Sequence, residues 1–262
     1  METIAFYNLK GGVGKTTSAV NIAWQAASEG IATLLWDLDP QGAASWLLNS
    51  QQKSLAPKKL LTGKTPIGKL VKATDYANLD MIAADLSMRH FDTLLSQQQE
   101  KGRDDLIRQL VAPLAEQYQL IVLDCPPSFS LLSEQIFNTA DALFVPLIPT
   151  PLSLRTFEQT RDFFKENQLK AKRLHGFFNM VDRRRTMHRV ILTHPPKTLK
   201  NRLKTVLPYS ALIEKMGEYR APLGCFAGKS PIALAYQHMW HEMRALLGEF
   251  SSSRDWQQTA RC

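Results

Sequence analysis

The feature that most constrains the fold is a glycine-rich segment, KGGVGKTT, at residues 10–17. It follows a β-branched and apolar run at 3–7 and leads into a helical pattern at 15–29. Its glycines let backbone N–H groups approach phosphate oxygens without obstruction from a Cβ atom, and the start of the helix adds its positive dipole end. The order of strand, loop and helix indicates a phosphate-binding P-loop rather than a simple connecting turn.

Each residue type in this loop predicts one part of a nucleoside triphosphate site. Lys15 is expected to reach the β and γ phosphates, and the hydroxyl group of Thr16 is expected to bind magnesium. ATP and Mg²⁺ are therefore the predicted cofactors. The loop residues expected to contact the nucleotide are Gly11, Gly12, Val13, Gly14, Lys15, Thr16 and Thr17.

Beyond the loop, short β-branched runs alternate with helical patterns, which is typical of βαβ units and a parallel sheet. Strands are expected at 3–7, 32–37, 79–83, 120–124, 142–146, 173–179 and 205–207, and helices at 15–29, 104–117, 131–139, 153–167, 187–202 and 231–248. The stretch 49–76 is expected to form loops with a short helix. These patterns predict a three-layer α/β P-loop NTPase fold with a mostly parallel twisted sheet flanked by helices. A single domain is expected over 1–250, followed by a polar tail at 251–262.

Two acidic residues follow the second expected strand in WDLDPQGAAS, which begins at Trp36. Asp37 and Asp39 then lie at the carboxyl edge of the sheet, where open α/β sheets bind ligands. Asp39, directly before Pro40, is also a good candidate for a helix N-cap. The two interpretations remain open on spacing alone.

A third motif, IVLDCPPS, places Asp124 after four apolar strand residues and therefore at the same edge as the P-loop. This arrangement is a Walker B motif, in which Asp124 is expected to hold Mg²⁺ through water. Two prolines end the strand and stiffen the next loop. Cys125 is expected to be a small packing residue rather than a nucleophile.

Positive charge is concentrated in one part of the chain. The net charge is +8, but residues 161–204 alone carry thirteen lysine and arginine residues against three acidic residues, or +10. Such a field favours binding to nucleic-acid phosphates, with a strong dependence on salt, although a solvated basic face is the alternative. The residues expected to contact DNA are Arg183, Arg184, Arg185 and Arg189, at a turn that enters a helix.

Other classes of protein are disfavoured by the composition. No apolar run approaches the ~18 residues of a membrane span. Cys125, Cys225 and Cys262 are too few and too scattered for a disulfide framework or a zinc site. The functional loop begins within a few residues of Met1, so no cleaved leader is expected, and the cytoplasm is the expected compartment.

Together the three motifs resemble those of the ParA/MinD family of deviant Walker A ATPases. The resemblance implies that Lys10 crosses a dimer interface to the ATP of a partner subunit. It also implies that Asp39 orients or activates the attacking water, with Asp37 in a supporting role near magnesium. Asn179, in the segment NMVD, matches the position where relatives contact adenine, although it could equally be a turn residue.

Further segments extend the resemblance over nearly the whole chain, among them IPTPLSLRTFEQT and FFNMVDRRRTMHR. The Asp-x-Pro-Pro form of the third motif is similar to the ParA branch. With no helix-turn-helix expected before the first strand, the chain resembles the compact, Soj-like type.

The resemblance implies an ATP hydrolase that forms an ATP-dependent sandwich homodimer and binds DNA without sequence preference. Such a protein is nucleoid-associated and positions or segregates a plasmid, chromosome or protein complex, with hydrolysis stimulated by a ParB-like or other small activator. One alternative is a MinD-like membrane ATPase, but the apolar residues of the last helix are expected to pack on the core instead, and no stable membrane insertion is expected. Those residues are Ile232, Leu234, Ala235, Met239, Met243, Leu246 and Leu247. The second alternative is an ATP-driven metabolic reductase or synthetase.

Overall fold

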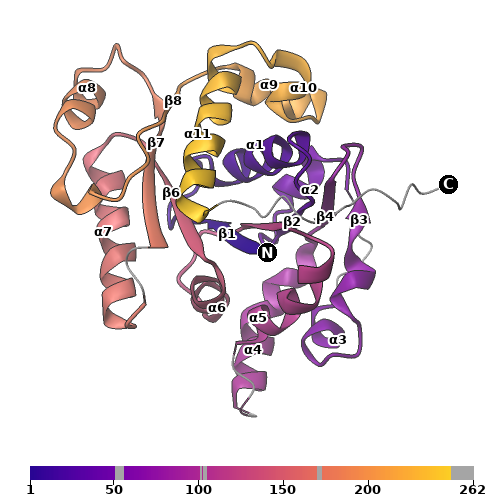
Figure 1. The fold of residues 1–262 in the computed structure, drawn as a ribbon. Coiled ribbons are helices and arrows are strands. Elements are labelled where there is room, and N and C mark those ends of the chain that lie inside the picture. The colour runs from indigo at the N-terminus through magenta and orange to yellow at the C-terminus, as the bar shows by residue number, and fades with distance from the viewer. Residues whose placement is uncertain (51–55, 101, 103–104, 170–172, 249–262) are drawn as a thin grey trace.

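The computed structural model of the chain describes residues 1–50, 56–100, 102, 105–169 and 173–248. Over these residues one eight-stranded sheet runs through the molecule in the order β3-β4-β2-β5-β1-β6-β7-β8 (Figure 1). All neighbouring strands are parallel except β3, which is antiparallel to β4. The strands are β1 (Glu2–Phe6), β2 (Thr33–Asp37), β3 (Lys72–Ala73), β4 (Leu79–Ile82), β5 (Leu120–Asp124), β6 (Ala142–Leu147), β7 (Leu174–Val181) and β8 (Val206–Pro208).

Helices cover both faces of the sheet, and each face has its own apolar core. On one face lie α1 (Lys15–Ser28), α2 (Ala43–Leu47), α9 (Leu212–Tyr219), α10 (Leu223–Ala227) and α11 (Pro231–Leu247). On the other lie α3 (Pro57–Leu61), α4 (Phe91–Gln99), α5 (Leu106–Val111), α6 (Leu131–Thr139) and α7 (Pro151–Glu166). The expected three-layer P-loop NTPase architecture is therefore confirmed, and α8 (Thr186–Thr193) lies at the β8 end of the sheet (Figure 1).

The central strands explain why the apolar runs of the sequence are continuous rather than alternating. All five residues of β2 and all five of β5 are buried, as expected for parallel strands covered on both faces. Their register pairs Asp37 with Asp124, while Phe6 of β1 pairs with Asp124 from the other side. Three neighbouring strands therefore end together at one edge.

Several elements differ from expectation. The helix expected at 187–202 ends at Thr193, because Pro195 and Pro196 follow it and cannot continue a helix. The helix expected at 104–117 is α5, followed by a 3₁₀ turn at Ala112–Glu116 that contains a proline. The stretch 49–76 holds α3, a 3₁₀ turn at Ile67–Leu70 and β3, while the tail at 251–262 lies outside the described residues.

The last helix buries most, but not all, of its expected apolar face. Ile232, Met239 and Met243 are buried in the core beside α1, whereas Leu234 and Leu246 are exposed. The expectation that all seven apolar residues pack on the core is therefore wrong for these two leucines. The face that packs is completed by Ala233, Tyr236 and Trp240.

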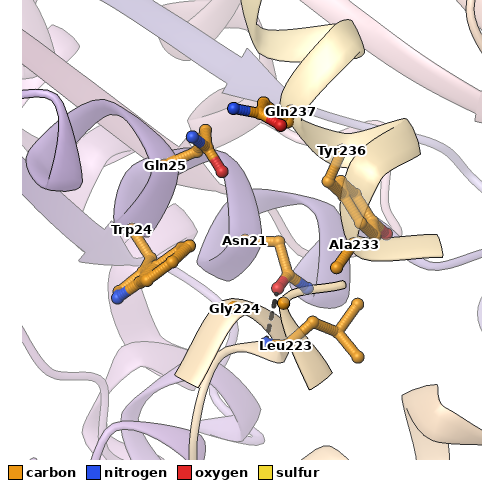
Figure 2. A pocket seen from close by; sticks show the side chains of 9 residues that line it. Asn21, Trp24, Gln25, Leu223, Gly224, Ala233, Tyr236 and Gln237 are labelled. Atoms are coloured by element: carbon orange, nitrogen blue, oxygen red, sulfur yellow. Dashed lines mark hydrogen bonds between the residues drawn. The ribbon is translucent and has the colours of Figure 1, made fainter. Parts of the chain in front are cut away.

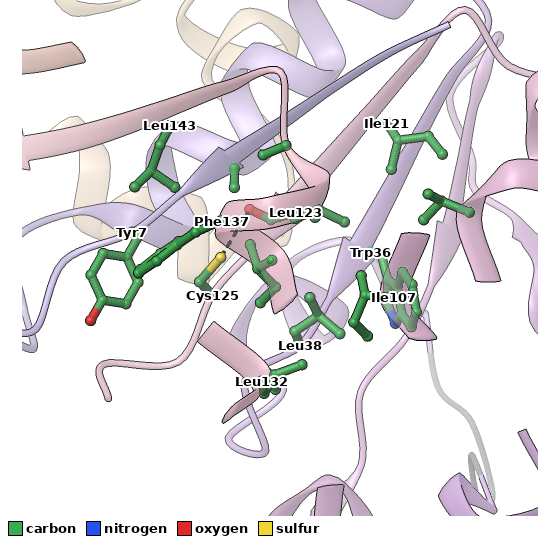
Figure 3. Packing of buried hydrophobic residues seen from close by; sticks show 14 of the residues in the cluster. Tyr7, Trp36, Leu38, Ile107, Ile121, Leu123, Cys125, Leu132, Phe137 and Leu143 are labelled. Carbon is green, nitrogen blue, oxygen red and sulfur yellow. Dashed lines mark hydrogen bonds between the residues drawn. The ribbon is translucent and has the colours of Figure 1, made fainter. Parts of the chain in front are cut away.

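Cys125 lies under the end of β5, inside the apolar cluster that also contains Tyr7, Leu132 and Phe137 (Figure 3). Burial raises the pKa of its thiol well above the ordinary value, so it stays protonated. The expectation of a packing residue is confirmed.

Candidate nucleotide-binding site

The P-loop joins β1 to α1, and its backbone needs glycine at two positions. Gly12 and Gly14 have φ angles of 71° and 92°, in the left-handed region that other residues rarely adopt. Gly14 is constrained a second time, because a Cβ atom there would lie 2.3 Å from Nδ2 of Asn179. Two left-handed residues turn the chain so that α1 starts directly after the loop.

Asn179 fastens this loop to the end of β7. Its side-chain Nδ2 donates a hydrogen bond to the carbonyl oxygen of Val13 at 2.7 Å, and its Oδ1 accepts one from the backbone N–H of Met180. Asn8 fastens the other end, since its Oδ1 accepts from the N–H of Lys10 and its Nδ2 donates to the carbonyl of Pro146. The side chains of Asn8 and Asn179 therefore fix the shape of the loop at both ends.

Lys15 is buried, with 7% of its surface exposed, and its Nζ donates to the carbonyl oxygen of Lys10 at 3.4 Å. Burial lowers the pKa of this ammonium group, while the nearby carboxylates of Asp124 and Asp39 act in the opposite direction. None of the ion pairs within the described part of the chain includes Lys15. Its charge is thus available to an anion at the loop.

Asp124 is the most unusual group of the site. It is completely buried, and within the described residues neither carboxylate oxygen has a hydrogen-bond partner of ordinary geometry. Burial and then the neighbouring carboxylate of Asp37 raise its pKa well above the usual value, although Thr16 and Lys15 oppose this rise. A buried carboxylate with so few hydrogen bonds is rare in a native fold, and a bound cation would satisfy its oxygens.

The donors around Asp124 fit a magnesium ion. A carboxylate and the hydroxyl group of Thr16 are hard oxygen ligands of the kind that Mg²⁺ accepts, and this ion commonly completes its shell with water and phosphate. Within the described residues no three His, Cys, Asp or Glu side chains form a metal-binding cluster. The protein ligands therefore suit an ion that arrives with a nucleotide rather than one held by a protein cage.

Asp37 and Asp39 have different environments although they are two residues apart. Asp37 is buried, and its oxygens accept hydrogen bonds from the N–H of Asp39 at 3.1 Å and from both the N–H and the hydroxyl group of Ser45, at 2.9 and 2.7 Å. Burial raises the pKa of Asp37 to about 6. With its oxygens occupied in this way, Asp37 positions the turn that carries Asp39 and the start of α2.

Asp39 is only partly buried and lies in that turn. Its Oδ1 accepts from the N–H of Gln41 at 2.9 Å, and no contact of Oδ2 occurs among the described residues. The alternative that Asp39 caps a helix does not hold, because Gly42 occupies the cap position of α2. One carboxylate oxygen therefore remains available beside Asp124 and Lys15, whose pKa values both respond to Asp39.

A cavity of about 120 Å³ opens on the α1 side of the P-loop. Gly14, Thr17 and Asn179 form one wall, and the expected base-binding position of Asn179 therefore does face a cavity, although its amide group already holds the loop. A second wall was not anticipated from the sequence. It consists of Pro208 at the end of β8, Tyr209 and Ser210 after it, and Ile213 and Glu214 of α9.

A second cavity of about 150 Å³ lies between α1, α10 and α11, and Tyr236 lines both (Figure 2). The carbonyl oxygen of the Asn21 side chain accepts a hydrogen bond from the N–H of Leu223 at 2.9 Å, and its Nδ2 donates to the carbonyl of Thr17. The bond from Leu223 holds α10 against α1, while the bond to Thr17 lies within α1 and orients the Asn21 amide; neither has a signature in the local sequence.

The remaining predicted residues lie on either side of this centre. The Lys10 side chain is half-buried on the loop, and it makes no ion pair with the described residues. The four predicted DNA contacts are exposed, three at the turn between β7 and α8 and the fourth on α8, outside the nucleotide cavity. They are Arg183, Arg184, Arg185 and Arg189.

These four arginines differ in how far they are already engaged. Arg184 donates two hydrogen bonds to Asp182, and this contact holds the pKa of the Asp182 carboxyl at about 2. Arg185 lies 3.8 Å from the same carboxylate, and Arg189 donates to the hydroxyl group of Thr186. Within the described residues Arg183 takes part in none of these pairs.

Known proteins resemble this chain in both sequence and fold. Residues 1–175 match a family model described as an AAA domain. A chromosome-partitioning ATPase Soj of Treponema pallidum is 28% identical over 95% of this chain and 99% of its own length. The cell division protein PomZ of Myxococcus xanthus is 37% identical over 56% of this chain, and the chain spans only 46% of that protein.

Solved structures share the fold at lower identity. A McdA–ATP complex from Cyanothece superposes with a TM-score of 0.81 at 16% identity, covering 93% of this chain and 96% of that one. A cobyrinic acid a,c-diamide synthase from Mycobacterium smegmatis, solved with an ATP analogue and magnesium, gives 0.77 at 24% identity and 97% coverage of both chains. These likenesses concern the fold. The family model covers most of the chain, and a Soj relative aligns along nearly all of it. The P-loop also lies beside the buried Asp124. On these grounds the chain belongs to the ParA/MinD family of P-loop ATPases.

Proposed function

We propose that this protein is a ParA-like ATPase whose ATP-dependent dimer binds DNA without sequence preference and positions or segregates a cargo. The observation that carries the proposal is the buried carboxylate of Asp124, which lies beside Lys15 and Thr16 and has no hydrogen-bond partner of ordinary geometry within the described residues. Its surroundings suit a nucleotide with its magnesium ion. Soj and PomZ, the relatives named above, are described as partitioning and cell-division proteins.

In this proposal each residue of the centre has one task. The P-loop amides and Lys15 bind the phosphates, and Thr16 and Asp124 hold Mg²⁺, which supplies charge neutralisation when bound. Asp39 uses its free oxygen to orient the attacking water, while Asp37 keeps the Asp39 turn in place through its bond to the Asp39 N–H. The 120 Å³ cavity receives the base.

Lys10 links hydrolysis to dimerisation. Its backbone is held by Asn8 and Lys15, yet its side chain has no ion-pair partner in the described structure, so it is free to reach a neighbouring molecule. A cation supplied from a partner subunit to the phosphates would resemble an arginine finger, which contributes strongly to phosphoryl transfer. In this proposal a small activator protein stimulates ATP hydrolysis by binding at the dimer interface.

The dimer is tested by light scattering after size exclusion, with and without Mg²⁺ and ATP. The parent protein is expected to change from monomer to dimer when ATP is present, and Lys10→Ala is expected to remain monomeric while still binding nucleotide. Lys58→Ala, an exposed lysine on α3, serves as the matched control and should dimerise normally. A parent protein that stays monomeric in ATP would refute the proposal.

The role of Asp39 is tested separately by turnover. Asp39→Ala is expected to bind ATP normally but to hydrolyse it about 100-fold more slowly, a typical contribution of a positioned acid–base group. The exposed Asp75→Ala variant carries the same loss of charge and should keep the parent rate. Equal turnover of the parent and Asp39→Ala would rule out the assigned role.

Two alternatives make different predictions. A MinD-like protein should be retained on anionic liposomes in ATP, and the same experiment with duplex DNA separates the two. Within the described residues no helix is long and apolar enough to cross a membrane. A metabolic synthetase should consume a second substrate in step with ATP; the resemblance to the cobyrinate synthase concerns the fold alone.

A further inference from the structure

A second candidate site lies at the edge of the sheet, where β8 ends the strand order. A cavity of about 250 Å³ is lined there by three basic side chains, Arg183, Arg202 and Lys204. They come from different segments: the turn after β7, the segment after the 3₁₀ turn at Lys197–Leu199, and the approach to β8. Phe178 and Val206 of the sheet are among the apolar residues that line the same cavity.

These three cations have no carboxylate partner within the described part of the chain. Two acids beside these segments make other contacts. Glu242 of α11 accepts hydrogen bonds from the backbone N–H groups of Lys204 and Thr205, at 2.6 and 2.9 Å, rather than pairing with the Lys204 ammonium group. Asp182 is occupied by Arg184.

Three like charges around one hollow repel each other, and neither Asp182 nor Glu242 forms an ion pair with any of them within the described residues. An anion in the cavity would remove that repulsion. The planar guanidinium groups of two arginines match the oxygens of a phosphate group, and a lysine adds a third, point-like charge. The Thr193 hydroxyl group, which also lines the cavity, is a further donor for such an oxygen.

The cavity does not end at the three cations. A neighbouring cavity of about 280 Å³ shares Arg183 and Val206 with the first and continues to Pro231 and Ala235 of α11. The two cavities therefore adjoin each other beside β8, with lining residues from α8 in the first and from α11 in the second. The three cations gather in the first cavity, whereas Arg183 is the one charged residue in the described part of the chain that lines the second.

We propose that the cavity lined by the half-buried Arg202 and the exposed Arg183 and Lys204 is a seat for a backbone phosphate of duplex DNA. This inference rests on the proposed function, because it locates the DNA contact that the function requires. It also changes which residues are expected to contribute most to DNA binding. Arg184 is already bound to Asp182. Arg202 and Lys204 lie at the seat, although they are not among the DNA contacts expected from the sequence.

The test compares cations that line the seat with cations near it that do not. Arg202→Gln and Lys204→Gln remove one charge each at the seat; Lys197→Gln and Lys200→Gln remove the same charge from exposed positions a few residues away. Binding of the ATP-loaded proteins to a labelled 40-base-pair duplex is measured by fluorescence anisotropy over a range of salt concentrations. Circular dichroism and thermal melting check that every variant folds.

Each seat variant is expected to weaken binding at least about 10-fold and to reduce the slope of log affinity against log salt by about one, as for one lost phosphate contact. The two control variants are expected to lose less than about 3-fold. Equal losses in all four variants would overturn the seat and leave a diffuse basic face. A parent protein that dimerises in ATP but does not bind the duplex would overturn the seat together with the DNA part of the proposed function.

The last part of the experiment measures binding of the same variants to vesicles of phosphatidylglycerol and phosphatidylcholine. Selective loss of vesicle binding by the seat variants, with duplex binding unchanged, would assign the cavity to lipid headgroups and overturn the proposal. Selective loss of duplex binding supports it.

Discussion

Replacing Asp124 with asparagine is expected to make the nucleotide-free protein more stable, although it damages the site. The carboxylate is fully buried, its two oxygens lack hydrogen-bond partners of ordinary geometry within the described structure, and its pKa is raised by burial and by Asp37. Asparagine has nearly the same shape but carries no charge. The variant therefore removes the electrostatic penalty while leaving the packing intact.

The expected gain can be worked from these contacts. An unpartnered buried polar group costs about 1–3 kcal/mol, and a charged one costs more, so removal of the charge should recover about 2 kcal/mol. In a domain of this size each kcal/mol corresponds to about 2–4 °C in Tm, which gives an expected rise of about 4–8 °C. Because the folded-state pKa is raised, the penalty is absent at low pH and grows as pH rises through that pKa. The gain should therefore be larger at pH 8 than at pH 5.

The assay is thermal unfolding followed by calorimetry, in EDTA and again with Mg²⁺ and ATP. In the parent, ligand at 100 times its Kd should add about 2.7 kcal/mol. In Asp124→Asn the added effect of Mg²⁺ over ATP alone should disappear. Asp162→Asn, at an exposed surface pair with Arg161, is the control and should change Tm little. An Asp124→Asn variant less stable than the parent at pH 8 in EDTA would refute the reasoning.

Two further predictions concern the loop and the turn. Gly14→Ala should lower the Tm of the nucleotide-free protein by several degrees, because the φ of Gly14 is 92° and the new Cβ would lie 2.3 Å from Nδ2 of Asn179. Gly11→Ala should not lower the Tm, because there is open space around Gly11. Equal Tm values for the two variants would contradict the close contact between Gly14 and Asn179. The Asp37 pKa rises from 3.8 to about 6, so the folded state holds this proton more tightly, and its contribution to stability is present below pH 4 and lost as pH rises through 6. The loss is at most about 3 kcal/mol. Urea unfolding at pH 4.5 and 7.5 should show a smaller decrease for Asp37→Asn than for the parent, and an identical decrease would count against this assignment.

Local signals explain why some elements could be predicted closely from the sequence. The strand at 120–124 and the helix at 131–139 have the observed bounds, because the strand ends at a proline pair and Ser130 caps the helix. The P-loop and the two carboxylate motifs are local as well. They could therefore be placed at one sheet edge without any knowledge of tertiary contacts.

The elements that were missed depend on distant parts of the chain. α2 has only five residues, and the N–H of Ser45 in its first turn is held by Asp37. α10 packs against α1 so closely that a Cβ at Gly224 would overlap the ring of Trp24 (Figure 2). The periodicity of apolar residues along the sequence does not reveal such contacts, so neither α2 nor α10 could be predicted.

The residues of the site divide in the same way, into those with a local sequence signal and those without one. The sequence predicts Asn179 as a residue near the base, which stays a prediction, but its bond to Val13 joins positions 166 apart, and no motif specifies it. The cavity wall at 208–214 was missed for the same reason, as was the proposed cationic seat, whose members become neighbours only when β8 joins β7. Charge counting identified a basic segment but could not tell engaged arginines from free ones.

The clamp of Asn179 on the P-loop has a consequence for how the protein registers which nucleotide it holds. A loop already fixed at Val13 and Lys10 gives up little conformational entropy when phosphates enter, so ATP and ADP can exchange without refolding it. The difference of one phosphate must then be sensed by groups that the fold leaves loose. We expect these groups to be the Lys10 ammonium group, which makes no ion pair with the described residues, and the free oxygen of Asp39.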